Sequence, residues 1–124
     1  MRAMASSAVE SSFLSFYPID MLPVVARLVD EEVAEVNALI LSMIEAERRP
    51  GKLDLGTIER IITMYGAVRE DVDLYDEQLR RWSRLELTRE LEQEVERLLG
   101  QAEALKAGAE YLVSMGRKLK QGLS

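Results

Sequence analysis

The sequence predicts an all-α fold, an antiparallel up-down-up bundle of three long helices with coiled-coil-like heptad packing. Three observations support this prediction. Apolar residues recur with alternating spacings of three and four along most of the chain, and only two short segments with turn residues interrupt them. The last third carries leucine at every seventh position: Leu91, Leu98, Leu105, Leu112 and Leu119. Most of the intervening a positions hold Ala or Gly, which lets a neighbouring helix come close.

Composition excludes several classes of function. The chain has 124 residues, the size of one domain, and its formal net charge of −6 disfavours binding to nucleic acid or an anionic membrane. It contains neither Cys nor His, which removes disulfides, zinc sites and triad hydrolases and predicts a protein without a cofactor. No apolar run reaches the roughly 18–20 residues that span a bilayer, and residues 1–10 lack the apolar core of a signal peptide. We therefore expect a cytoplasmic protein.

Residues 1–17 form a separate segment in this prediction. They are rich in Ser and Ala and then aromatic, with Phe13, Phe16 and Tyr17 just before Pro18. Such a segment is expected to be partly mobile, with its apolar end docked on the bundle as a short helical turn or an extended arm. Residues 18–124 are expected to form the single bundle domain.

The first helix is predicted over about residues 21–48. Asp20 is available as an N-cap, Pro23 suits the first turn, and Pro50-Gly51 ends the helix. Its apolar stripe is wide enough to face two neighbouring helices.

The second and third helices are predicted over about residues 55–82 and 88–121. Asp54 is a good N-cap for the second helix, whose repeat continues in phase across Gly66. Its aromatic residues Tyr65, Tyr75 and Trp82 lie at core positions, which favours packing over a stacking surface for a cofactor or base. Capping residues between 83 and 88, including Thr88, indicate the turn into the third helix.

The third helix is the longest, so it should extend beyond the first turn by roughly two turns, around residues 117–124. Leu119 and Leu123 would then continue the apolar stripe with nothing in the same chain to cover them. An uncovered stripe end predicts a homodimer or a bound protein partner. The residues predicted to make this contact are Leu112, Gly116, Leu119 and Leu123, with Tyr111 and Met115 beside them. For Gly116, close packing of a helix from the same chain is an equally good interpretation.

A cluster of cations is predicted at the same end of the bundle. It comprises Arg48, Arg49, Lys52, Arg117, Lys118 and Lys120. Such a basic pole could receive an acidic peptide, a nucleotide or a phosphate backbone. The cations could equally serve to stabilise the partly negative carboxyl ends of the first and third helices, which meet there.

One carboxylate, Glu32, falls in the middle of the first helix's apolar stripe, and Glu35 lies at its edge. The string from Leu28 to Val36 resembles the first metal-binding helix of the MazG-like all-α nucleotide pyrophosphohydrolases. The resemblance implies that Glu32-x-x-Glu35, with Glu-x-x-Asp on a later helix, holds Mg²⁺ against a nucleotide's phosphates.

Geometry places the second half of that motif elsewhere. The only match to Glu-x-x-Asp is Glu70-x-x-Asp73, and a helical turn of about 100° per residue directs both side chains to water. Glu32 is then expected to pair with an arginine, such as Arg60 or Arg69, or one from a second subunit.

The sequence therefore predicts a non-catalytic oligomeric adaptor, chaperone-like protein or assembly subunit that acts through helix–helix contact. An Mg²⁺-dependent nucleotide pyrophosphohydrolase that uses Glu32 and Glu35 is the alternative.

Overall fold

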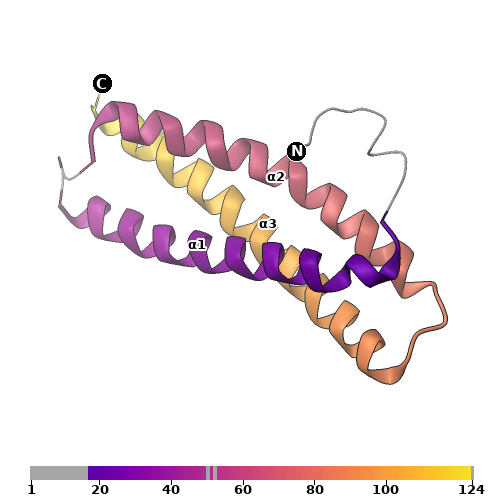
Figure 1. Cartoon of the computed structure of the whole chain (residues 1–124). Helices are drawn as coiled ribbons and strands as arrows, with labels where there is room; N and C mark the ends of the chain where they lie inside the picture. Colours follow the sequence, from indigo (N-terminus) through magenta and orange to yellow (C-terminus); the bar gives the residue numbers. More distant parts are fainter. Residues whose placement is uncertain (1–16, 50, 52, 124) are drawn as a thin grey trace.

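The fold is all-α, as predicted. The structure, a computed structural model, describes residues 17–49, 51 and 53–123. In this part of the chain a short 3₁₀ helix, η2 (Ile19–Met21), precedes three long helices, α1 (Leu22–Arg48), α2 (Leu55–Ser83) and α3 (Arg89–Leu123) (Figure 1). Residues 1–16 of the predicted arm, together with Pro50, Lys52 and Ser124, lie outside the described residues. No helix in the described part has both the length and the apolar character needed to cross a bilayer.

The start of α1 differs from the prediction. Met21 is its N-cap residue, and no side chain caps the first turn. Asp20 instead lies within η2, where the chain has already turned into helical geometry, so its carboxylate is not the cap. Pro23 occupies the first turn of α1, where its missing N–H costs nothing.

The starts of α2 and α3 follow the local sequence signals. The Asp54 carboxylate accepts a hydrogen bond from the Thr57 N–H at 2.7 Å, which caps α2 as predicted. The Thr88 hydroxyl accepts one from the Leu91 N–H at 3.2 Å at the start of α3. Each cap joins two residues that are three apart in sequence, so both caps can be predicted without a tertiary structure.

Helix α3 packs against both α1 and α2 and supplies more buried core residues than either of them. It is unbroken through Gly100 and Gly108, and Leu98, Leu105 and Leu112 are fully buried. Burying an apolar side chain of this size stabilises the fold by roughly 1.5–3 kcal/mol. The leucine row therefore holds the three helices together.

Two glycines of α3 allow close approach to the other helices. A Cβ added at Gly108 would collide with Val36 Cγ1 of α1. A Cβ added at Gly116 would lie 2.8 Å from Ile62 Cγ1 of α2. Both glycines are buried, so α3 contacts a different neighbour through each of them.

The predicted overhang of α3 is corrected by these contacts. Lys118 pairs with Glu47 of α1 at 3.0 Å, and Lys120 pairs with Glu59 of α2 at 3.1 Å. The carboxyl end of α3 is thus flanked by both helices to within about one turn of its end. Helix lengths alone do not reveal which neighbouring residues flank the end of α3.

A polar network also joins α1 to α3. The Arg97 guanidinium donates two hydrogen bonds to the Asp30 carboxylate, at 3.0 and 2.9 Å, and Gln101 Nε2 donates a third at 2.9 Å. Arg97 also donates to Glu94 at 2.9 Å. These bonds lower the pKa of Asp30, chiefly through Arg97 and then through Gln101. The network is exposed, so it fixes the position of α1 along α3 more than it stabilises the fold.

Candidate interaction surface at the helix ends

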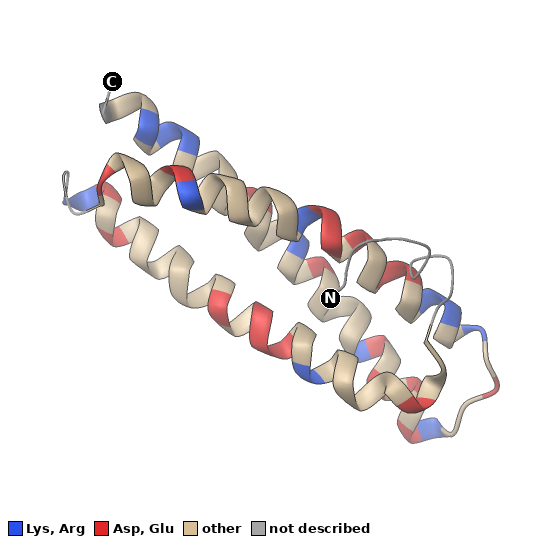
Figure 2. Ribbon diagram, turned by 45° about the horizontal axis from the view of Figure 1, so that its top comes forward, with Lys and Arg blue, Asp and Glu red and all other residues tan. Residues whose placement is uncertain are grey.

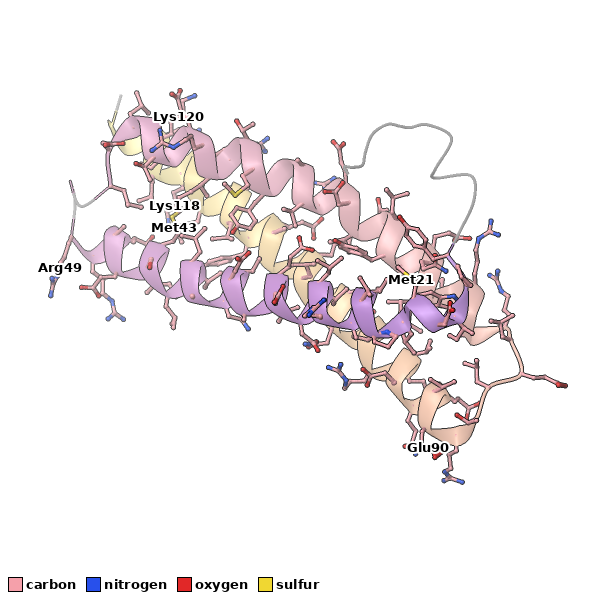
Figure 3. All side chains as sticks on the ribbon, viewed as in Figure 1. Met21, Met43, Arg49, Glu90, Lys118 and Lys120 are labelled. Carbon is pink, nitrogen blue, oxygen red and sulfur yellow. The ribbon has the colours of Figure 1, made fainter. Side chains whose placement is uncertain are left out.

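The carboxyl ends of α1 and α3 and the start of α2 meet at one end of the molecule, which we call the pole. Lys118, Lys120 and Arg49 lie there, whereas Met21 and Glu90 lie at the opposite end (Figure 3). Lysine and arginine gather along the last turns of α3 and at the end of α1 (Figure 2). The structure thus brings together the described members of the predicted basic pole, and Lys52 lies outside the described residues.

Most of these cations have an acidic partner within the chain. Arg49 pairs with Glu45 at 2.9 Å, in addition to the pairs of Lys118 and Lys120 with Glu47 and Glu59. These ion pairs fit the interpretation that the cations stabilise the ends of the helices. Arg48 and Arg117 are exposed beside them. The pole carries more cations than carboxylates and can attract an acidic ligand.

The pole also contains an apolar hollow of about 260 Å³, which we call the pole hollow. It is lined by Ala46, Glu47, Gly51, Leu53, Ile58, Lys118, Leu119 and Gly122. A cavity of about 150 Å³ can hold a benzene ring, so this hollow has room for one large apolar side chain. Its apolar walls come from all three helices and from the α1–α2 connection. Only the tertiary structure could reveal it, because its residues are dispersed in the sequence.

A second hollow, the lateral groove, lies between α2 and α3 and shares Lys118 with the first. Its volume is about 340 Å³, and it is lined by Arg69, Glu110, Val113, Ser114, Arg117, Lys118 and Gln121. Arg69 and Glu110 stand 3.8 Å apart and are half exposed, so their mutual attraction is weak. Lys118 borders both hollows and connects the apolar site to the cationic one.

The predicted contact residues of the third helix occupy different environments. Leu112 is fully buried, Gly116 packs against Ile62 and Met115 belongs to the core cluster, so these three residues face their own chain. Contact of these residues with a partner stays a prediction, and the observed packing is with the chain's own helices. The physical reason is that α3 packs against two helices, so its buried face is wider than a two-position heptad stripe.

Of the other three predicted contact residues, two lie at or near the surface, and the side chain of the third is outside the described part of the structure. Tyr111 is exposed, and Leu119 is partly buried at the wall of the pole hollow. The side chain of Leu123 lies outside the described part of the structure. Leu119 is therefore the predicted anchor that the structure places at a hollow.

Glu32 is half buried between α1 and α2. The Tyr75 hydroxyl donates a hydrogen bond to its carboxylate at 2.7 Å. Burial raises the pKa of Glu32, the Tyr75 bond partly offsets that effect, and the nearby carboxylates of Asp71 and Glu35 raise the pKa further. Glu32 thus lies in an environment that disfavours its charge.

The expected arginine partner of Glu32 is not the observed one. Arg60 donates a hydrogen bond to Thr57 at 3.2 Å, and Arg69 lies beside Glu110. Arg60 and Arg69 are therefore not the partner, because Tyr75, at a core position of α2, bonds the carboxylate with its hydroxyl group. A buried tyrosine needs a hydrogen-bond acceptor, which makes this pairing favourable for both residues. An arginine from a second subunit stays a prediction.

The second half of the metal motif lies away from Glu32, as the helical geometry predicted. Glu70 and Asp73 are exposed, and Asp73 accepts a hydrogen bond from Lys106 at 3.4 Å. Glu35 is exposed as well. In the described ranges, no group of three or more carboxylates is placed to hold a metal ion.

Comparison with known proteins gives no family or relative from which a function could be inferred. The chain matches no protein-family model, no curated protein and no solved structure.

Proposed function

We propose that this chain is a non-catalytic helical adaptor that binds an acidic protein segment at the pole. The observation that carries the proposal is the pole hollow, an apolar site for one side chain whose rim and neighbouring groove bear cations. An aromatic or leucine side chain of the partner occupies the hollow, and flanking Asp or Glu residues face Arg117, Lys118 and Arg48. Charge complementarity favours this occupant, because a basic or neutral segment would gain nothing from the rim.

The proposal includes the up-down-up arrangement with coiled-coil-like heptad packing. Support comes from the order of the contacts between α2 and α3. Residue numbers fall along α3 as they rise along α2, from Glu59–Lys120 to Arg69–Glu110 and Asp73–Lys106. Between α1 and α3 they rise together, from Asp30–Arg97 to Glu47–Lys118. This arrangement places the ends of α1 and α3 at the same pole and thereby forms the hollow.

A random peptide library displayed on phage tests the proposed partner without assuming its sequence. We expect selection on the full chain to enrich peptides with one large apolar residue flanked by Asp or Glu. Leu119→Asp places a charge in the hollow and should abolish their binding, and Arg117→Glu should weaken it about tenfold or more. Because Arg117 is exposed, its replacement leaves the fold intact even where Leu119→Asp disturbs the end of α3.

Matched controls separate the pole from the rest of the surface. Leu41→Asp changes an exposed leucine of α1, and Arg84→Glu reverses an exposed cation in the α2–α3 connection. Both variants should bind the selected peptides as the original chain does. Selection of peptides without acidic residues, equal losses in the controls, or no enrichment would each overturn the proposal.

The predicted homodimer provides a competing occupant of the pole hollow. Light scattering on the full chain and on Leu119→Asp distinguishes the two possibilities. A monomer in both cases leaves the hollow open to another protein and supports the proposal. A dimer that Leu119→Asp converts to a monomer would mean that a second copy fills the hollow, and the acidic partner would be the wrong occupant.

Glu32 provides a prediction about stability and pH. A raised pKa in the folded state means that protonation of Glu32 favours folding. This contribution is fully present below the unfolded value of 4.5 and is lost as pH rises through the folded value. Glu32→Gln keeps an acceptor for Tyr75 and removes the charge, so it should stabilise the chain by up to about 1 kcal/mol at pH near 8. Urea unfolding should show this gain shrinking towards the acidic end, and a gain independent of pH would contradict the assignment.

The Mg²⁺-dependent pyrophosphohydrolase remains the alternative, since a half-buried carboxylate with a raised pKa can also mark a functional site. The thermal midpoint separates it from the adaptor. Binding of Mg²⁺ to Glu32 and Glu35 would raise the Tm of the chain but not that of Glu32→Gln. The adaptor should show no dependence on Mg²⁺ in either protein.

A further inference from the structure

The lateral groove between α2 and α3 concentrates positive charge. Arg69 lies on α2, and Arg117 and Lys118 lie near the carboxyl end of α3. Glu110 is the one carboxylate among the described residues that line the groove. A hollow of about 340 Å³ thus has three cations against one carboxylate, although the whole chain has a net charge of −6. This local reversal of the overall charge favours an anionic ligand.

The three cations have hydrogen-bond donors left for such a ligand. Arg69 Nε faces the Glu110 carboxylate at 3.8 Å, which is too long for a hydrogen bond, and a guanidinium has five N–H donors. In the described part of the chain, no carboxylate pairs with Arg117. Lys118 pairs with Glu47 at 3.0 Å, but its side chain is 70% exposed. That pair is therefore weak, and the ammonium group can turn to a ligand.

The donors that line the groove fit a phosphate monoester better than a carboxylate. A phosphoryl group carries about −1.5 to −2 charges at pH 7 and presents three acceptor oxygens. Three cationic side chains supply one donor group for each oxygen, and Ser114 adds a hydroxyl donor. The charge of a dianion also balances the excess of cations over carboxylates. None of the described lining residues is aromatic, so the groove has no stacking surface for a nucleotide base.

Lys118 joins this groove to the pole hollow, because it lines both. A segment whose apolar side chain fills the pole hollow therefore carries its neighbouring residues past Lys118 towards the groove. The side chains of Arg69 and Lys118 are 54% and 70% exposed, so a free anion would be held weakly. Attachment to a segment that is anchored in the pole hollow raises the local concentration of the anion.

We propose that the lateral groove binds a phosphorylated side chain of the partner segment, which Arg69, Arg117 and Lys118 hold by its phosphate. This assignment rests on the adaptor function proposed for the pole, because one segment occupies both hollows. It adds a specificity that acidic residues alone do not provide. The partner then binds tightly only after phosphorylation, since the added charge and the three oxygens are what the groove recognises.

Nuclear magnetic resonance titration of the full chain with a blocked phosphoserine, N-acetyl-O-phosphoserine N-methylamide, tests the groove by itself. At about pH 7.5, where the phosphate is a dianion, it should shift the amide signals of residues 110–118. The equally blocked glutamate should bind at least about fivefold more weakly. Arg69→Gln and Arg117→Gln should each weaken binding of the phosphoserine by about fivefold or more, the scale of one ion pair at a protein surface.

Arg48→Gln is the matched control, because Arg48 is an exposed cation of the pole that does not line the groove. This variant should bind the blocked phosphoserine within about twofold of the original chain, since exposed charges further apart are screened by salt. All three arginines are exposed, so circular dichroism should show the same helix content in each variant. Equal weakening in Arg48→Gln, equally tight binding of the glutamate, or no shift in residues 110–118 would each overturn the assignment.

Peptides separate this assignment from the adaptor function. Each peptide has one leucine with acidic flanks, and a serine one to five residues away is made with and without phosphate. We expect phosphorylation to tighten binding of the best peptide about tenfold or more, and Leu119→Asp to weaken that peptide without affecting the blocked phosphoserine. A peptide that binds at the hollow with no gain from phosphate would overturn the phosphate assignment alone. A phosphopeptide indifferent to Leu119→Asp would overturn the adaptor function alone, and inorganic phosphate binding as tightly as the phosphopeptide would make a free anion the ligand and reject the phosphorylated partner.

Discussion

Replacing Trp82 by alanine should produce the largest loss of stability of any variant considered for this chain. Trp82 is the only tryptophan, it is almost fully buried near the end of α2, and its indole N–H donates to the Tyr17 carbonyl. Deleting so large a buried side chain costs about 3–5 kcal/mol, because the cavity left behind is only partly filled by relaxation. Domains of this size have a total stability of roughly 5–15 kcal/mol, so this variant should be marginally folded.

Trp82→Phe is the matched control, because it keeps most of the apolar volume and removes the indole N–H. Its cost should be smaller, about 1–2 kcal/mol, the scale of one hydrogen bond plus a small packing defect. Urea unfolding followed by far-ultraviolet circular dichroism measures both variants, since neither retains the indole fluorescence. If Trp82→Ala cost no more than Trp82→Phe, the packing around this residue would be looser than the structure indicates.

Replacing Gly108 by alanine should destabilise the chain, although alanine is the better helix former. The added Cβ collides with Val36 Cγ1, and Val36 is itself buried and β-branched, so it cannot swing aside. Overpacking of this kind costs about 1–3 kcal/mol, which exceeds the gain in helix propensity of about 1 kcal/mol. We expect a net loss of about 1 kcal/mol, with α1 displaced from α3.

Gly100 provides the opposite result within the same helix. It is exposed, and a Cβ at this position meets nothing within 4 Å. Gly100→Ala should therefore stabilise the chain by about 0.5–1 kcal/mol through helix propensity alone. Thermal unfolding of the two variants side by side checks the prediction. The same sign for both substitutions would contradict the close contact between α1 and α3.

Local signals account for what could be predicted. The N-caps at Asp54 and Thr88 use residues three positions apart, and the leucine row through Leu98, Leu105 and Leu112 is a property of one helix. Such patterns require no knowledge of neighbouring helices. They were sufficient to predict the all-α class and the helix ends, which the structure has within two residues of the expected positions.

Contacts between distant segments account for what could not be predicted. Tyr75 lies 43 residues from Glu32, and Gln78 lies 61 residues from Tyr17, so no local pattern pairs them. The burial of Met115 in the core has a related cause, because a heptad identifies one buried face and α3 has two neighbours. The pole hollow likewise depends on where three helices end relative to one another.

The amino-acid sequence by itself determined that this chain forms three long helices, where they begin and end, and that leucines of the third are buried. These properties follow from capping and from helical periodicity, which act over a few residues. Only the tertiary structure decided which glycine meets which helix, what Glu32 bonds, and that Leu119 borders a hollow beside cations. The position of one helix along its neighbour is fixed by side-chain packing across the whole interface. A shift by one turn would change all of these contacts without altering any helix.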